Sequence, residues 1–464
     1  MPTSREKIEQ WSLAYSILKR YVDWSFHFYF KTTVSGLNNL PKNKTLIFAP
    51  NHQNALMDAL AVLCVQSWQP IFLARADIFK KPIISKILTF IKILPVYRIR
   101  DGYGNLQKND EIFNKTVDVF KNKNGLVILP EGNHGDKKRL RPLKKGVARI
   151  ALQAEEACDE SLDIQIIPVG LDYTHYSKVG SELHISFGMP IGVKPFMKTY
   201  KNNSAKAYNM LISTLEKGIK GEMVDVEDEK YYTIYKIIID AFASDCLEQK
   251  KLSKSHHNII EAQQGIIEKI NQFKRLFPDD FLLLAADALE YRLLLNRRNL
   301  KPGLFPMTHK QSVGLAPLGL SLVISLPLFI YSFINIMLPI GVAKLVGRKI
   351  QDAQFVSSVL FTVGILLTPI FHAMQIAAFA IITGNLAYTL AYAVSLPLSF
   401  YMFFGWKKWW EIFIHRMKEV KCKTINTSRN VRLYGLHKSI KEQLRRIVAI
   451  KDETDYLSSK ATDY

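Results

Sequence analysis

The chain has 464 residues, of which 48% are hydrophobic, and its 62 Lys and Arg residues outnumber its 41 Asp and Glu residues, giving a net charge of +21. This length allows two or three domains, and this charge favours an anionic partner, either a nucleic acid or a membrane surface. The sequence contains no zinc-finger cysteine spacing, no RNA-binding aromatic signature and no helix-turn-helix pattern. Together with the long apolar segments described below, this favours a membrane as the partner, and we expect no nucleic acid.

The cysteines and the N-terminal residues predict the cellular compartment. The four cysteines are far apart and form neither a CxxC motif nor a disulfide framework, so we expect reduced thiols in a protein that faces the cytoplasm. The first ten residues are polar and charged, without the apolar stretch of a signal peptide. We expect the first domain to lie on the cytoplasmic side of the membrane.

The first half of the chain predicts an α/β fold. Residues 8–30 have the pattern of one amphipathic helix rich in aromatic side chains, which lie either at a lipid interface or against the next domain. Strands and helices then alternate to about residue 220, which favours a mostly parallel sheet flanked by helices. The predicted strands are 31–35, 45–49, 70–74, 126–129, 165–171 and 184–187, and the predicted helices are 56–66, 83–91, 109–122, 144–156 and 205–220.

The second half of the chain predicts helices only. Apolar residues recur at helical spacing through 231–247, 258–276 and 281–295, without a chemical motif. Two long runs without Asp, Glu, Lys or Arg follow, at 311–343 and 353–406. Since a membrane span needs about 20 apolar residues, the first run fits one transmembrane helix and the second fits two, near 355–375 and 378–400.

The basic residues around these runs bear on topology. One cluster lies between the two runs and another follows the second, and cationic loops prefer the cytoplasm. Three full spans would place one cluster outside, whereas a re-entrant hairpin that breaks near Pro327 would keep both on one side. We predict an N-terminal amphipathic helical segment (1–35), an α/β domain (36–222), a helical region (223–310), a membrane domain (311–406) and a basic C-terminal tail (407–464).

Four motifs that carry polar or proline residues occur at the ends of apolar runs in the α/β domain. The first is Asn-His at 51–52, followed by Asp58, and it comes directly after a predicted buried strand. The second is Pro-Val-Tyr-Arg at 95–98, the third is Leu-Pro-Glu-Gly at 129–132, and the fourth is Ile-Pro-Val at 167–169. In α/β folds the ends of strands commonly carry the chemistry.

These four motifs, in this order and with similar separations, resemble the glycerolipid acyltransferase family, over roughly residues 36–192. The resemblance implies an O-acyltransferase of phospholipid biosynthesis. Such an enzyme moves a fatty acyl group from an acyl-CoA or acyl carrier protein thioester to glycerol 3-phosphate or 1-acylglycerol 3-phosphate. It implies no further cofactor and no metal, a membrane lipid as partner, and a catalytic domain on the cytoplasmic face of an integral membrane protein.

Two departures from the family pattern affect this expectation. Five residues separate His52 from Asp58, where the family usually has four; a yeast-type branch of glycerol-3-phosphate acyltransferases has a similar gap, which tilts the expected acceptor towards glycerol 3-phosphate. The Thr-Arg that usually ends the third motif is replaced by Asn133-His134. The candidates for taking over the role of that arginine are Arg139, Arg141, Lys144 and Lys145.

The resemblance assigns His52 as the general base and Asp58 as the carboxylate that orients it. A neutral imidazole can remove the proton of the acceptor hydroxyl as the oxygen attacks the thioester, and a carboxylate can hold the ring in the correct tautomer. Residues six apart lie about 240° apart on a regular helix. His52 is therefore expected in the loop before a helix, with Asp58 in its first turns.

The remaining candidates bind substrate. Arg98, which matches the family arginine, and Arg100, which does not, are expected to bind the phosphate of the acceptor, because guanidinium donors match phosphate oxygens. Glu131 is expected either to position the acceptor or to complete a network beside His52. Gly132 is expected to allow close backbone approach, with its amide a candidate oxyanion donor. Lys145, with its neighbour Lys144, is a candidate for binding the anionic donor or the membrane.

Three other interpretations remain at this point. A metal hydrolase could use His52, Asp58, Glu131 and His134, since these residue types ligate metals, although their spacing matches no metal motif. An acyltransferase could act on another membrane lipid. The chain could also be a non-catalytic lipid-binding scaffold, against which the retention of the motif residues argues.

Overall fold

The structure is a computed structural model that describes residues 7–97, 108–135, 137–249, 252–253, 255–302, 305–306, 314–425 and 427–449. The chain divides into two compact units. The first consists of Met1–Asp225 and Val342–Leu366, and the second consists of Val226–Gly341 and Leu367–Tyr464.

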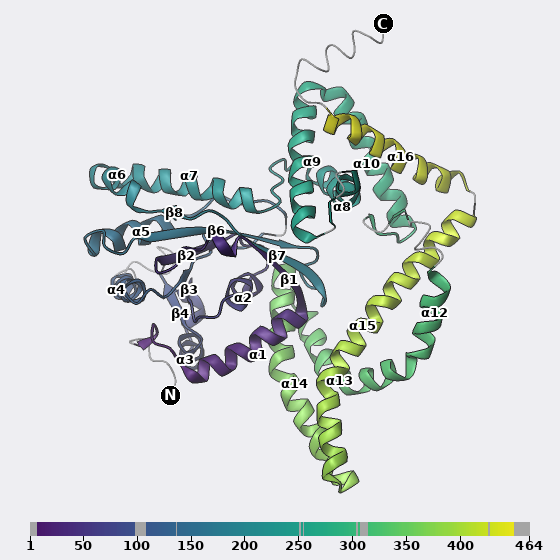
Figure 1. Ribbon diagram of the computed structural model, residues 1–464, viewed down its shortest axis with the longest axis horizontal. Helices are drawn as coiled ribbons and strands as arrows, with labels where there is room; N and C mark the ends of the chain where they lie inside the picture. The colour runs from purple at the N-terminus through teal and green to yellow at the C-terminus, as the bar shows by residue number, and fades with distance from the viewer. Residues whose placement is uncertain are drawn as a thin grey trace. The chain divides into compact units, whose positions relative to one another are not determined.

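A mixed sheet forms the centre of the first unit, with strand order β1-β7-β6-β2-β5-β3-β4 and with β8 paired to β6 (Figure 1). The strands are β1 (Phe30–Ser35), β2 (Thr45–Pro50), β3 (Ile71–Arg75), β4 (Ile93–Val96), β5 (Leu126–Val127), β6 (Ile164–Tyr173), β7 (Ser181–Phe187) and β8 (Ile191–Gly192). The pairs from β6 through β2, β5 and β3 to β4 are parallel, as is β1 with β7, whereas β7 and β8 are antiparallel to β6. Strands β2, β4, β5 and β6 therefore end at the same edge of the sheet.

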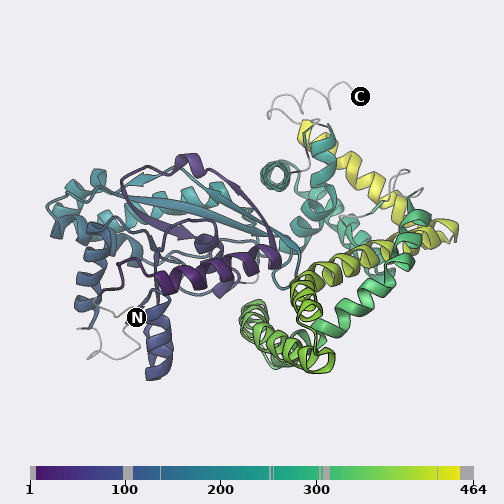
Figure 2. The same cartoon turned by 60° about the horizontal axis from the view of Figure 1, so that its bottom comes forward.

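Helices cover both faces of this sheet, and each face has its own apolar core. In β2, Ile47 and Ala49 belong to one core while Leu46 and Phe48 belong to the other, because successive side chains of a strand point to opposite faces. The first core also contains residues of α4 (Lys108–Lys121), α5 (Gly146–Ala157), α6 (Met197–Asn202) and α7 (Ser204–Glu222). The second contains residues of α1 (Leu13–Tyr29), which runs along the sheet in Figure 2, α2 (Leu56–Cys64) and the start of α14 (Ala353–Thr383).

The α/β fold with a mostly parallel sheet is confirmed, and the predicted strands are all present within a few residues. The sequence pattern did not predict β4 and β8. Strand β4 is short and contains Pro95, and it lies at the edge of the sheet, where proline is tolerated because no ladder is needed on the outer side. The N-terminal amphipathic helix α1 is shorter than predicted, because Ser12 caps its start by accepting a hydrogen bond from the Tyr15 amide. Helix α3 (Pro82–Phe90) follows β3.

The second unit is helical, as predicted. Helices α8 (Tyr232–Gln249), α9 (His256–Leu276), α10 (Pro278–Arg297) and α16 (Ser428–Ala449) pack on one another. Tyr291 is fully buried at their centre, and its hydroxyl lies 3.1 Å from Nδ1 of His437. The unit also contains α12 (Leu315–Ile324), most of α13 (Leu326–Gly347), the second part of α14, and α15 (Leu386–Thr424).

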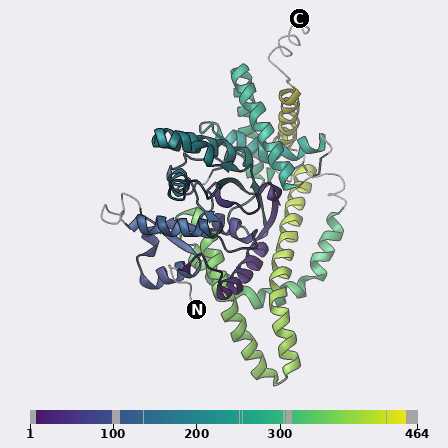
Figure 3. The same cartoon turned by 60° about the vertical axis from the view of Figure 1, so that its left-hand side comes forward.

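Of the helices that the structure describes, three, α13, α14 and α15, are long and apolar enough to cross a membrane, which indicates membrane association. Helices α14 and α15 form a hairpin that turns at Gly384, where φ is +57°, and Asn385 then caps α15 (Figure 3). The predicted break near residues 375–378 was therefore placed too early, because the glycine and the capping asparagine decide the turn. The first apolar run breaks at Ser325, close to the predicted Pro327. The sidedness of the helices stays a prediction.

Candidate active site

The loop that follows β2 is anchored to the neighbouring strand β6 by the side chain of Asn51. Its Oδ1 accepts a hydrogen bond from the Leu171 amide at 2.6 Å, and its Nδ2 donates to the Leu171 carbonyl at 3.1 Å. The Asn51 amide donates to the Val169 carbonyl, so the chain stays paired with β6 beyond the end of β2. This anchor fixes the position from which His52 leaves the sheet.

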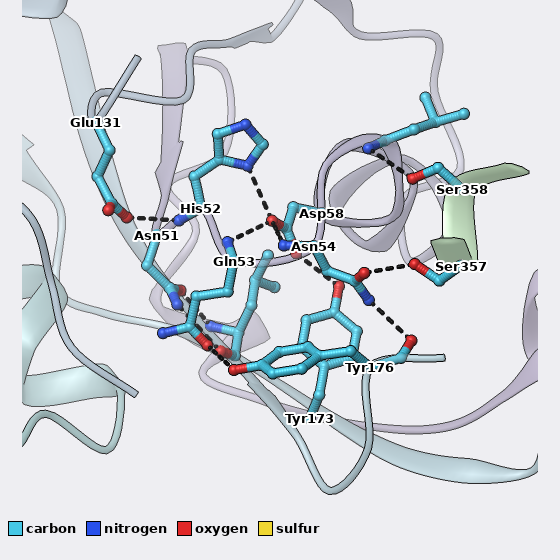
Figure 4. Close-up of polar contacts among 12 residues, drawn as sticks. Asn51, His52, Gln53, Asn54, Asp58, Glu131, Tyr173, Tyr176, Ser357 and Ser358 are labelled. Carbon is cyan, nitrogen blue, oxygen red and sulfur yellow. Dashed lines mark hydrogen bonds and ion pairs between the residues drawn. The ribbon is translucent and has the colours of Figure 1, made fainter. Parts of the chain in front are cut away.

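The carboxylate of Asp58 lies in the first turn of α2 and faces back towards this loop (Figure 4). Its Oδ2 lies 2.9 Å from Nδ1 of His52 and accepts the amides of Gln53 at 2.7 Å and Asn54 at 2.6 Å. Its Oδ1 accepts the hydroxyl of Tyr173 at 2.8 Å. The structure thus places His52 before the helix and Asp58 within its first turn, which is the arrangement that the six-residue spacing requires.

This hydrogen-bond pattern determines the useful tautomer of His52. A carboxylate is an acceptor only, so the hydrogen bond to Asp58 requires the proton on Nδ1 of the ring. The other nitrogen, Nε2, then carries a lone pair that can accept a proton. The side chain of His52 is 14% exposed and that of Asp58 is fully buried, so the pair can act as an oriented base whose histidine is not sealed from solvent.

Glu131 links the His52 loop to a guanidinium group. Its Oε1 accepts the His52 amide at 2.6 Å, and its Oε2 accepts both Nε of Arg141 at 3.0 Å and the Arg141 amide at 3.3 Å. Burial raises the pKa of Glu131, although these hydrogen bonds and the charge of Arg141 act in the opposite direction. Within the described part of the chain, Nη2 of Arg141 is buried and has no hydrogen-bond partner.

For the other predicted substrate-binding residues, the structure shows no hydrogen bond to His52 or Asp58 among the residues that it describes. Gly132 has φ of +72°, which explains the glycine, but its amide donates to the Leu129 carbonyl at 3.2 Å and closes a turn, so in this structure it is not a free oxyanion donor. Lys145 is exposed directly before α5. Arg98 and Arg100 lie outside the described residues.

His134 lies beside the catalytic candidates. Its ring centroid is 5.5 Å from that of His52, and its Nε2 is 3.4 Å from Oδ2 of Asp352. Burial lowers its pKa, although Asp352 acts in the opposite direction. Among the residues that the structure describes, no group of three or more His, Cys, Asp or Glu side chains is arranged to hold a metal ion.

Three further side chains of the site, those of Tyr173, Ser357 and Ser358, were not predicted from the sequence. Tyr173 reaches Asp58 from the end of β6, and Asn54 and the α2 start contact Ser357 and Ser358 of α14. Tyr173 could have been suspected only as an aromatic residue with a hydroxyl at a strand end. The contacts with α14 had no sequence signal, because about 300 residues separate the partners.

Known proteins resemble this chain over part of its length. Residues 31–172 match the family described as Acyltransferase. The chain is 32% identical over 114 residues to glycerol-3-phosphate O-acyltransferase 2 of Saccharomyces cerevisiae, covering 24% of this chain and 15% of that protein. It is 31% identical over 139 residues to the chloroplastic 1-acyl-sn-glycerol-3-phosphate acyltransferase BAT2 of Brassica napus, covering 29% of this chain and 38% of that protein. The matches thus span well under half of either relative.

One solved structure is also similar, the crystal structure of the 1-acyl-sn-glycerophosphate acyltransferase PlsC from Thermotoga maritima. The likeness has 16% sequence identity and a TM-score of 0.33, and it covers 45% of this chain and 78% of that chain. A score this low carries no argument about the fold or the function of this chain.

Proposed function

We propose, from the match of residues 31–172 to the acyltransferase family, that the protein transfers a fatty acyl group from an acyl thioester to the hydroxyl of a glycerol-phosphate acceptor. The donor would be acyl-CoA or acyl carrier protein, and the acceptor glycerol 3-phosphate or 1-acylglycerol 3-phosphate. The observation that carries the proposal is the pair of His52 Nδ1 and Asp58 Oδ2 at 2.9 Å, beside the bridge from Glu131 to Arg141.

His52 would act as the general base through Nε2. As the acceptor oxygen attacks the thioester carbonyl carbon, its proton moves to Nε2 and a C–O bond forms. The resulting imidazolium is stabilised by the buried carboxylate of Asp58. When the tetrahedral intermediate collapses, the C–S bond breaks, and the leaving thiolate takes the proton from the imidazolium, so that the base is regenerated. No serine or cysteine nucleophile is needed, because the acceptor hydroxyl attacks directly.

We propose that Arg141, together with Arg98, binds the phosphate of the acceptor. The Glu131 carboxylate holds one edge of the Arg141 guanidinium through Nε, while Nη2 has no partner among the described residues. A guanidinium has five donors in a fixed plane, and phosphate oxygens match this geometry. Since Glu131 also holds the His52 amide, the same carboxylate would set the distance between the phosphate site and the base.

The acceptor assay tests the reaction. The full chain, purified in detergent, is incubated with labelled acyl-CoA or acyl carrier protein thioester and with glycerol 3-phosphate, 1-acylglycerol 3-phosphate or unphosphorylated lipid acceptors. We expect transfer to a phosphorylated acceptor, abolished by His52→Ala and retained by His257→Ala, which replaces an exposed histidine of the second unit. Transfer only to unphosphorylated lipids would identify another lipid acyltransferase. Absence of transfer to every acceptor would favour a scaffold.

Arg141→Ala tests the phosphate site. Loss of one charge-assisted hydrogen bond costs about 1.5–3 kcal/mol, so KM for the phosphorylated acceptor should rise by about 10- to 100-fold. The control is Arg149→Ala, which removes an exposed guanidinium from α5 that lies over the ring of Tyr208. If Arg141→Ala lowers the use of phosphorylated and unphosphorylated acceptors equally, then Arg141 does not bind the phosphate.

We also propose that the catalytic domain lies on the cytoplasmic face of the membrane. The basic residues near the ends of the apolar helices support this side, because cationic loops prefer the cytoplasm. Cysteine accessibility labelling at Arg348 and at Lys423 tests the arrangement in which both lie on one side. Labelling from opposite sides would rule out the re-entrant hairpin.

A further inference from the structure

The first turns of α14, a helix with the length and composition of a membrane span, contact the loop that carries His52. Ser357 donates a hydrogen bond from its hydroxyl to Oδ1 of Asn54 at 2.5 Å, and both side chains are fully buried. Oγ of Ser358 accepts the amide of Leu56 at 3.1 Å. Figure 4 shows these two serines on one side of the Asp58 carboxylate, opposite Glu131.

The contact of Ser358 replaces a missing helix cap. The first amides of a helix have no partner within the helix, and a side chain at the N-cap usually accepts one of them. At α2 the N-cap is Ala55, which has no hydrogen-bonding side chain. Ser358 therefore satisfies the first amide of α2 from a distant part of the chain.

The same serines flank a strained residue. Ala55 has φ of +45° and ψ of −124°, a region that is comfortable only for glycine. Such a conformation persists only where the surrounding structure determines it. Here the residue before Ala55 is held by Ser357 and the residue after it by Ser358, so α14 fixes the loop on both sides of the strained residue.

The loop that contains Asn54 and Ala55 is connected to His52 through the carboxylate of Asp58. The Asn54 amide donates to the same Asp58 oxygen that faces His52, and the Asn54 side chain donates to the Tyr176 carbonyl at 3.1 Å. Further along α14, Phe361 is buried against Phe26 and Tyr29, with ring centroids 6.2 and 5.7 Å away. The start of α14 is thus part of the core of the first unit.

We propose that Ser357 and Ser358 are positioning residues for acyl transfer, which makes the start of α14 a support of the catalytic loop as well as part of a membrane helix. The inference rests on the proposed function, because it takes His52 as the base. The two serines do not touch the substrate. They keep Asp58 and His52 in register by holding the backbone of residues 54–56.

Kinetics of the full chain in lipid nanodiscs test this role, with acyl-CoA and the best acceptor of the wild type. We expect Ser357→Ala/Ser358→Ala to lower kcat about tenfold and to change both KM values less than about twofold, because the defect lies in the orientation of the base. The single variant Ser357→Thr, which keeps a hydroxyl at this position, should retain most of the wild-type kcat. The matched control is Ser399→Ala, which replaces a fully buried serine whose hydroxyl donates to the Leu396 carbonyl within α15.

A second replacement separates positioning from a general loss of folding. Glycine adopts the backbone conformation of Ala55 without strain, so Ala55→Gly should restore part of the rate when it is added to Ser358→Ala. This comparison holds even if the double serine variant fails to fold. Wild-type kcat in the serine variants, a rate loss equal to that of Ser399→Ala, or no gain from Ala55→Gly would overturn the proposal. The proposed function fails separately, if His52→Ala still transfers acyl groups.

Discussion

Replacing Asp58 by Asn tests the proposed catalytic pair of His52 and Asp58 with the smallest change of shape. Asn can keep an oxygen towards His52 and the amides of Gln53 and Asn54, while its amide group faces the Tyr173 hydroxyl, which can accept as well as donate. The fold should therefore be preserved, and the main loss is one negative charge beside the imidazolium that would form in the proposed reaction.

The size of this loss follows from the geometry. With Nδ1 of His52 and Oδ2 of Asp58 2.9 Å apart, the charge centres lie about 4 Å apart, and such a pair is worth about 4 kcal/mol at an effective dielectric constant of about 20. Since about 1.36 kcal/mol of barrier is a factor of ten in rate, we expect kcat to fall about a thousandfold.

The assay is the steady-state rate with labelled acyl-CoA, with thermal unfolding measured in parallel. The control is Asp77→Asn, which replaces a partly exposed carboxylate paired with Arg75 and should leave kcat within about twofold of the wild type. If Asp58→Asn retains a tenth or more of the wild-type kcat, the carboxylate does not stabilise a catalytic imidazolium and the reasoning is refuted.

Two further predictions concern stability in detergent. Because burial lowers the pKa of His134 below its ordinary 6.5, the folded state binds fewer protons than the unfolded state as the pH falls below about 6.5, so stability is lost on acidification. The thermal midpoint should therefore drop more between about pH 7.5 and pH 5.5 in the wild type than in His134→Asn, and equal drops would contradict this sign. Phe361→Ala, which empties a buried position against α1, should destabilise the first unit by about 3–5 kcal/mol. Leu366→Ala on the same helix, where the side chain is 62% exposed, should have little effect on the thermal midpoint; equal shifts would mean that Phe361 does not anchor α14.

The sequence was sufficient to predict the features of the structure that depend on a local pattern of residues. The alternation of strands and helices predicted the α/β unit, and the long uncharged runs predicted the three apolar helices. The angular argument on His52 and Asp58 predicted which of the two lies outside the helix, because helix periodicity is a local property. The same local logic missed β4, where Pro95 interrupts the strand pattern.

The contact between Glu131 and Arg141 could not be predicted from the sequence motif. The sequence offered four basic residues as substitutes for the missing family arginine, and nothing in their spacing separated them. The loop after β5 turns back so that Arg141 meets the Glu131 carboxylate at 3.0 Å, a pairing that depends on the path of a loop without periodicity.

The sequence by itself determined the α/β class, the apolar helices and the placement of His52 before a helix with Asp58 in its first turn, since each depends on a short stretch of chain. Only the tertiary structure decided that Tyr173 supports Asp58, and that two serines about 300 residues away hold the loop around Ala55. The physical reason is that these contacts complete backbone and carboxylate hydrogen bonds which the local chain leaves unsatisfied. The partners of these hydrogen bonds depend on how distant segments pack together, and such packing produces no periodic pattern in the sequence.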